Sequence, residues 1–217
     1  RNSGIISKCY VKGKIIIEDD SPDYIGGLCG TNELDNGLII DSYASVSIST
    51  GKWSQYIGGL AGENNGKIIG CYALGEINTG DKSRYIGGLS GDCSYAQNCY
   101  AAVSMNVGTD SDTYGGICGS GRNIFACFWN KEIAGIDPPD YFRLNMNGKT
   151  TSQMQDKKAF EEAGWVFADC QTGLKGWYLP ENSYPIHEWQ VTSELVEIPN
   201  VKMMSISEAT SMITAAG

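Results

Sequence analysis

The sequence has very little histidine: His187 is the only one among 217 residues. Metal sites built from several histidines are therefore excluded. The eight cysteines include no Cys-x-x-Cys pair, so the usual spacing of zinc and haem-attachment sites is also missing. No apolar run reaches the ~18 residues that a membrane-spanning helix needs. Basic residues number 16 against 25 acidic ones, and the formal charge of −9 argues against a nucleic-acid-binding protein.

Signals of catalysis are weak as well. His187 follows Ile186 and lies two residues before Trp189, which is typical of a packed side chain. Nothing around it resembles the glycine-flanked serine of a hydrolase nucleophile elbow. We therefore expect a protein that is not an enzyme and that has no catalytic residues and no cofactor.

Glycine is in excess, with 28 residues, and much of it belongs to a repeated block. Residues 24–30 read Tyr-Ile-Gly-Gly-Leu-Cys-Gly, and close copies occupy residues 56–62 and 85–91, with a degenerate copy at 114–119. The glycines that mark the block are Gly26, Gly27, Gly30, Gly58, Gly59, Gly62, Gly87, Gly88, Gly91, Gly115, Gly116 and Gly119. A second signature, Cys or Ser followed by an aromatic residue, begins at Cys9, Ser42, Cys71, Cys99 and Cys127. Both recur every 28–33 residues, which identifies an internal repeat.

The second signature opens a stretch in which apolar and polar residues alternate, which predicts a β-strand. Short strands and glycine turns at this period predict an all-β fold, a parallel β-helix-like solenoid of about four to five repeats. Stacked repeats would place equivalent residues about 4.8 Å apart. We expect a right-handed coil because parallel crossovers are nearly always right-handed. A β-propeller would need ~40 or more residues per blade.

Three of the blocks contain the sequence Gly-Leu-x-Gly, at residues 27–30, 59–62 and 88–91, whereas the fourth has Ile117 in place of leucine. These blocks resemble the GLUG motif, and the resemblance covers roughly residues 1–133. GLUG repeats occur in large bacterial surface and secreted proteins, including adhesin-like chains and some cell-surface peptidases. The resemblance thus implies an extracellular or cell-surface location and a repeat module that is not itself catalytic.

The period stops after Trp129, and Pro138-Pro139 marks a break. We predict a solenoid over residues 1–133 and a small mixed α/β cap over 134–193, with one short helix from Gln153 to Ala163. Three of the five tryptophans lie in this cap, which we expect to cover the last repeat; aromatic ligand binding is the alternative. Residues 194–217 resemble the first half of a PASTA domain, a module found outside bacterial cells, in Ile198-Pro199-Asn200-Val201 and Met204-Ser205. That resemblance implies an incomplete module: either the natural chain continues beyond residue 217, which we favour, or the segment is a decayed copy.

Cysteines in an extracellular chain suggest disulfides, but the repeat complicates that interpretation. Cys9, Cys71, Cys99 and Cys127 share one repeat position on the apolar face and form a predicted core cysteine ladder. Either they are buried thiols that pack as small hydrophobes, or at least one bridge forms. Cys29 and Cys118 share another position, and Cys93 and Cys170 are unplaced.

Two acidic clusters precede glycine blocks: Asp19, Asp20 and Asp23, and Asp110 and Asp112. They lie at one predicted corner of the solenoid, where solvated turn residues are expected. Calcium binding is the weaker alternative for these carboxylates, and glycoside hydrolysis the weakest.

The aromatic residues of the second signature fall on the polar side of their strands. The predicted aromatic face consists of Tyr10, Tyr43, Tyr72, Tyr100 and Phe128. Its stacking would stabilise the sheet, or its exposure would offer a platform for sugars or another protein.

We therefore predict a non-catalytic extracellular structural or adhesive protein. It would display a surface or self-assemble into a fibre or cell-surface layer, through the solenoid end and the PASTA-like tail. Its partners would be other copies of itself or further modules of a larger surface protein, and glycans or cell wall. The alternatives are a carbohydrate-binding or polysaccharide-processing β-helix module and the adhesin part of a larger surface enzyme.

Overall fold

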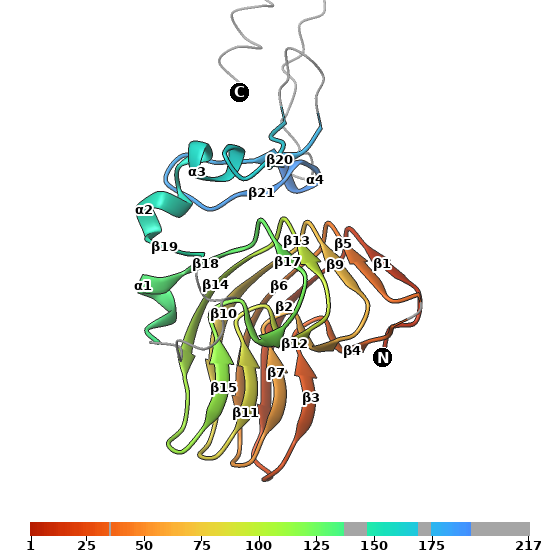
Figure 1. Cartoon of the computed structure of the whole chain (residues 1–217), viewed down its shortest axis with the longest axis vertical. Helices are drawn as coiled ribbons and strands as arrows, with labels where there is room; N and C mark the ends of the chain where they lie inside the picture. Colours follow the sequence, from red (N-terminus) through yellow and green to blue (C-terminus); the bar gives the residue numbers. More distant parts are fainter. Residues whose placement is uncertain (35, 137–146, 169–174, 192–217) are drawn as a thin grey trace, which may run out of the picture. The chain divides into compact units, whose positions relative to one another are not determined.

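The computed structural model describes residues 1–34, 36–136, 147–168 and 175–191. The chain divides into two compact units, residues 1–165 and 166–217. Unit 1 holds a parallel β-solenoid of about four turns, as the repeats predict, and Figure 1 shows its strands stacked coil upon coil. The PASTA-like segment lies outside the described residues.

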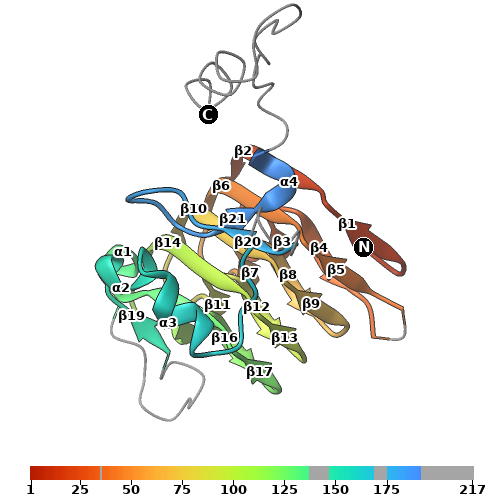
Figure 2. The same ribbon diagram turned by 90° about the horizontal axis from the view of Figure 1, so that it is seen from above.

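Each full coil contributes one strand to each of four parallel sheets, and Figure 2 shows equivalent strands side by side. The first sheet contains β1 (Ile5–Ser7), β5 (Leu38–Ile40), β9 (Lys67–Ile69), β13 (Ala96–Gln97) and β17 (Ile124–Phe125). The second contains β2 (Tyr10–Ile17), β6 (Tyr43–Thr50), β10 (Tyr72–Asn78), β14 (Tyr100–Asn106), β18 (Phe128–Asn130) and β19 (Gly148–Lys149). The third contains β3 (Asp23–Gly26), β7 (Gln55–Gly58), β11 (Arg84–Gly87) and β15 (Asp112–Gly115). The fourth contains β4 (Cys29–Asn32), β8 (Ala61–Asn64), β12 (Ser90–Cys93) and β16 (Cys118–Gly121).

Equivalent residues of successive coils pair in register, so each repeat position becomes a row along the solenoid. Ile48 pairs with Ile77, and Ile57 pairs with Ile86. These four side chains are fully buried. The rows therefore build one continuous hydrophobic core, which no single coil could bury alone.

The fourth block differs from the alignment suggested by its tyrosine. Tyr114 pairs with Ile86, so it occupies the isoleucine position of the block. Thr113 takes the place of the preceding tyrosine and has the same left-handed backbone, with φ at 58°. The glycine pairs set the register, because Gly115 pairs with Gly87.

The glycines of the block are required by close contact between coils. A Cβ added to Gly58 would lie 2.6 Å from the Cα of Ser90 and against the carbonyl oxygen of Ala61. One added to Gly62 would lie 2.6 Å from the backbone nitrogen of Ile25. Only hydrogen fits in these spaces, which explains why the Gly-Gly-Leu-x-Gly block recurs.

A buried row of asparagines links the coils at the end of the fourth sheet. The amide nitrogen of Asn2 donates to Oδ1 of Asn32 at 2.7 Å, and Nδ2 of Asn32 donates to Oδ1 of Asn64, also at 2.7 Å. Asn64 in turn donates to the carbonyl oxygen of Tyr95 at 2.9 Å and to Sγ of Cys93 at 3.3 Å. The row supplies the hydrogen bonds that these buried polar groups need.

Replacing Asn64 with alanine is expected to lower the free energy of unfolding by about 1–3 kcal/mol, because the row loses its bonds and Asn32 Nδ2 loses an acceptor. Urea denaturation would measure the loss. Asn106→Ala, at an exposed position of β14, is the control and should stay within about 0.5 kcal/mol of the parent chain. Equal stability of the two variants would show that the row is dispensable.

A large side chain closes the last coil of the solenoid. Trp129 continues a row of small residues, Ala44, Ala73 and Ala101, and is 4% exposed. Its indole lies against Gly116, where a Cβ would overlap the ring. The indole thus takes the volume that a further coil would fill.

Helices of unit 1 follow the last coil. They are α1 (Lys131–Ala134), α2 (Thr151–Met154) and α3 (Lys157–Glu161). The single helix predicted from Gln153 to Ala163 is wrong, because Asp156 caps a new helix by accepting from the backbone N–H of Lys158. Strand β19 pairs with β18, and Trp165 Nε1 donates to the carbonyl oxygen of Ala126 at 2.9 Å. The compact unit therefore extends beyond residue 133, the predicted end of the solenoid.

Unit 2 has a small hairpin and one helix among its described residues. They are β20 (Trp177–Tyr178), β21 (Ile186–His187) and α4 (Glu188–Val191). The ring of His187 stacks on Trp177 at 4.4 Å and on Trp189 at 5.6 Å, and the residue is buried. This packing agrees with the expectation that His187 is a structural side chain. None of the described helices has the length and apolar character to cross a membrane.

Candidate functional site: an exposed corner face

Two of the five candidate calcium ligands, Asp20 and Asp112, connect adjacent coils. Asp20 accepts from the backbone N–H of Lys52 at 3.0 Å. Asp112 accepts from Nε of Arg84 at 2.9 Å, and this bond holds the pKa of the Asp112 carboxyl below its usual value. Across the described residues, no three His, Cys, Asp or Glu side chains are arranged to hold a metal ion. Asp19, Asp23 and Asp110 lie in the same corner region, and all five carboxylates therefore stay unassigned to calcium.

The predicted cysteine ladder is present in three of its four members. Cys71, Cys99 and Cys127 are fully buried, whereas Cys9 is exposed, so its place in the core is wrong. Cys9 precedes β2, the edge strand of its sheet, and is covered on one side only. Each of the buried thiols donates to the carbonyl oxygen two residues earlier, as the hydroxyl of Ser42 does in its own coil.

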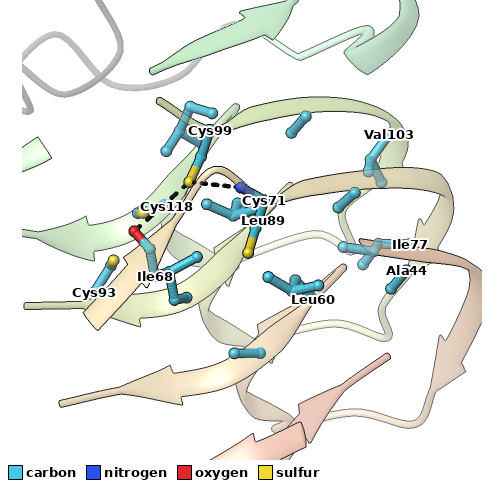
Figure 3. Packing of buried hydrophobic residues seen from close by; sticks show 14 of the residues in the cluster. Ala44, Leu60, Ile68, Cys71, Ile77, Leu89, Cys93, Cys99, Val103 and Cys118 are labelled. Atoms are coloured by element: carbon cyan, nitrogen blue, oxygen red, sulfur yellow. Dashed lines mark hydrogen bonds between the residues drawn. The ribbon is translucent and has the colours of Figure 1, made fainter. Parts of the chain in front are cut away.

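Two further cysteines join the buried thiols. Cys93 and Cys118 lie near Cys99 in the core (Figure 3), and the neighbouring Cys93 thiol adds to the rise in the pKa of Cys118. Burial raises the pKa of Cys118 and Cys127 well above the usual value. The described cysteines are all free thiols, Cys29 among them, and Cys170 lies outside the described residues. The repeat pattern left Cys93 unplaced, because its contacts depend on the neighbouring coil.

Alkylation by iodoacetamide at pH 8 is expected to modify Cys9 rapidly and Cys71 very slowly in the folded chain. Burial both blocks access and raises the pKa of the Cys71 thiol, so little reactive thiolate forms. Peptide mapping by mass spectrometry would give the two rates, and the same reaction in denaturant is the control. Similar rates for Cys9 and Cys71 in the folded chain would contradict this burial.

The predicted aromatic face forms a stacked row but not an open surface. Tyr43 and Tyr72 stack with ring centroids 4.7 Å apart, and Tyr72 and Tyr100 with centroids 4.9 Å apart. Tyr43, Tyr72, Tyr100 and Phe128 are buried, and only Tyr10 is well exposed. Alternation correctly placed these side chains on the outer side of the sheet, but later residues cover part of it: Phe160 and Trp165 contact Phe128, and Trp165 also contacts Tyr100.

A second tyrosine row lies on the third sheet, and the sequence interpretation missed it. Tyr24 and Tyr56 stack at 4.9 Å, and Tyr56 and Tyr85 at 4.7 Å. All three adopt left-handed backbone with φ between 55° and 58°. Tyr24 is 43% exposed, and the other two are half-buried. The tyrosine that begins three of the four glycine blocks could have indicated this row from the sequence. The left-handed backbone that orients the ring could not be predicted from it.

Carboxylates flank this tyrosine row on the fourth sheet. Glu63 and Asp92 pair in register on adjacent strands and are half-buried. Burial raises the pKa of the Tyr56 hydroxyl, and the neighbouring tyrosines Tyr85 and Tyr24 and the charges of Glu63 and Asp92 add to that effect. The Tyr56 phenol therefore stays protonated at neutral pH and offers an O–H donor near these carboxylates.

A groove of about 650 Å³ opens on the other side of the row. Its lining residues come from the corner before the third sheet and from the first residues of β7, β11 and β15: Ser21, Trp53, Gln55, Lys82, Arg84, Asp110 and Asp112. The guanidinium carbon of Arg84 lies 6.0 Å from the centre of the Tyr85 ring, so the groove adjoins the tyrosine row. We call the groove, the tyrosine row and Glu63 with Asp92 the corner face.

Trp53 is the most exposed large aromatic side chain of the groove, at 50%. Nζ of Lys82 lies 4.7 Å from the centre of its ring and covers one face of the indole. The preceding coil has only Ser21 at the same corner position, where each residue has φ between 55° and 64°. Backbone hydrogen bonds between coils hold the corner in place. The N–H of Ser21 donates to the carbonyl oxygen of Lys52, and the N–H of Trp53 donates to the carbonyl oxygen of Asp81.

Comparison with protein families finds one match: residues 54–78 match the GLUG motif. This segment covers β7 to β10, so the motif corresponds to the third and fourth sheets of one coil and the start of the next coil. Trp53 immediately precedes it, and Tyr56 and Glu63 lie within it. Comparisons with curated proteins and with solved structures found no match.

Proposed function

We propose that this chain is a non-catalytic extracellular module, structural or adhesive, that presents the corner face on a rigid solenoid. The observation that carries the proposal is this corner face, in which a row of stacked tyrosines, one groove and one pair of carboxylates lie on fixed backbone. Binding residues are commonly held on exposed loops by a rigid scaffold of this kind. The GLUG motif supports the extracellular location, because similar repeats occur in bacterial surface proteins.

Self-assembly is the structural form of the proposal. β1, β2, β3 and β4 are edge strands of the four sheets, and side chains on this first coil are exposed: Ile5, Tyr10, Ile16 and Leu34. Unpaired strand edges with exposed apolar side chains accept further strands. At the opposite end β19 extends the second sheet, whereas β15, β16 and β17 are edge strands like those of the first coil. The first coil, with its exposed apolar side chains, would provide one of the two joining surfaces.

Two measurements test the proposal. Antibodies against the chain should label intact source cells without permeabilisation, and beads coated with the whole chain should adhere to surfaces that uncoated beads do not bind. Electron microscopy with size measurement in solution tests assembly, with filaments or layers that join through the first coil as the expected result. Labelling only after lysis, together with no adhesion and no assembly, would overturn the proposal.

A further inference from the structure

We infer that the groove at Trp53 binds a neutral oligosaccharide of pyranose rings with equatorial hydroxyl groups, such as a β-1,4-glucan. This inference rests on the proposed function and names the ligand class of its binding surface. It begins from the position of Trp53, in the corner that each coil forms before the third sheet.

An aromatic residue is not needed to build this corner. The equivalent positions hold Ser21, Lys82 and Asp110, with the same left-handed backbone. For a bulky side chain this conformation is unfavourable. Trp53 also remains half exposed, so it gains little from burial. A costly, exposed tryptophan that the corner does not require points to a contact with a ligand.

The geometry leaves one indole face available. Lys82 covers the ring from the side of the following coil, and the preceding coil presents only the small side chain of Ser21. A pyranose with equatorial hydroxyls has a flat face of C–H groups, which packs on an aromatic ring. The stacked rings of Tyr24, Tyr56 and Tyr85 differ here, because neighbouring rings cover most of their faces. Trp53 is therefore the stacking platform of the corner face.

The polar side chains fit the hydroxyl edge of such a sugar. Arg84 and Asp112 form an ion pair at 2.9 Å, which holds both groups in place in the groove. Gln55 offers both a donor and an acceptor beside them. Fixed donors and acceptors around an apolar platform are the usual composition of a small-ligand site.

Charge favours a neutral ligand. Lys82 and Arg84 supply two positive charges to the lining of the groove, and Asp110 and Asp112 supply two negative ones. A polyanion would be attracted by the two basic side chains and repelled by the two acidic ones, and a strongly basic peptide would experience the reverse. The row spacing of about 4.8 Å places Ser21 and Asp110, three coils apart, roughly 14 Å from each other, so the groove can take a chain of several rings.

The test is calorimetric titration of the whole chain with cellohexaose, and with N-acetylchitohexaose as a second neutral probe. We expect binding of at least one probe at micromolar to millimolar concentration, little changed when salt is raised to about 0.5 M because neither partner contributes a net charge to the contact. Trp53→Ser, which copies the residue of the first coil, should weaken binding at least tenfold. Trp53→Phe should retain part of it.

Phe125→Gln is the matched control. Phe125 is also 50% exposed, it lies on the first sheet, and glutamine stands at the paired position of the preceding coil, Gln97. This variant should bind as the parent chain does. Circular dichroism would verify that each variant is folded.

Absence of binding to both hexaoses overturns the inference, and so does binding that Trp53→Ser leaves unchanged. Either result leaves the proposed function standing if beads coated with the chain still adhere. Salt-sensitive capture of a charged peptide that Trp53→Ser abolishes also overturns it and assigns the groove to peptides. Cleavage of a bound hexaose would support this ligand class while refuting the non-catalytic part of the proposed function.

Discussion

Gly58→Ala is expected to destabilise the solenoid by about 3 kcal/mol or more. The added methyl group would meet backbone on two sides, the Cα of Ser90 at 2.6 Å and the nitrogen of Gly91 at 2.9 Å, besides the carbonyl of Ala61. Backbone cannot move aside as a flexible side chain can, so adjacent coils must separate. The urea midpoint should fall accordingly, with the slope of the transition unchanged.

Gly4→Ala is the matched control for this glycine. A Cβ at Gly4 would have nothing within 4 Å, and its φ lies outside the left-handed region. The same substitution should therefore change stability by no more than about 0.5 kcal/mol. If Gly58→Ala were as mild as Gly4→Ala, the recurrence of glycine in the block would need a reason other than coil packing.

Trp129→Ala is expected to cost about 3–5 kcal/mol, the range for removing a large buried aromatic side chain. The indole fills the end of the core, where Gly116 and Gly148 leave room for it: a Cβ on Gly148 would lie 3.0 Å from the ring. Removing it leaves a cavity beneath β19, the strand that closes the second sheet.

Phe125→Gln serves as the control here too, because Phe125 belongs to the same coil but is half exposed. Thermal unfolding would give the comparison, with a marked fall in Tm for Trp129→Ala alone. A Trp129→Ala chain that melts with the control would mean that the helices and β19, rather than the indole, close the solenoid.

Much of the fold could be predicted from the spacing of two short signatures. Stacked coils demand that equivalent residues recur, so the period of 28–33 residues and the alternation after each cysteine were enough to identify a parallel solenoid. Gly-Leu-x-Gly likewise indicated close packing. The break after Trp129 predicted a cap with one short helix, but the described residues of the cap contain three, α2, α3 and α4. Asp156 ends the first of them by capping the second.

The candidate site was harder to predict. The sequence placed the functional aromatic row at Tyr10, Tyr43 and Tyr72, on the strands with the clearest alternation. The structure buries most of that row and exposes Tyr24, whose neighbours in the chain gave no alternating pattern. Left-handed backbone at this kink, with φ at 58°, reverses the side on which a simple strand would place the ring.

By itself, then, the sequence determined the repeat, the strand that follows each Cys or Ser signature and the positions that must be glycine, because these depend on residues that recur at a fixed distance along the chain. Only the tertiary structure decided which rows face solvent. Exposure depends on segments distant in sequence, such as Phe160 and Trp165 against Phe128, and on corners where φ turns positive. It also depends on neighbours one coil away, which place Lys82 over Trp53 and leave the other face of the indole open at Ser21.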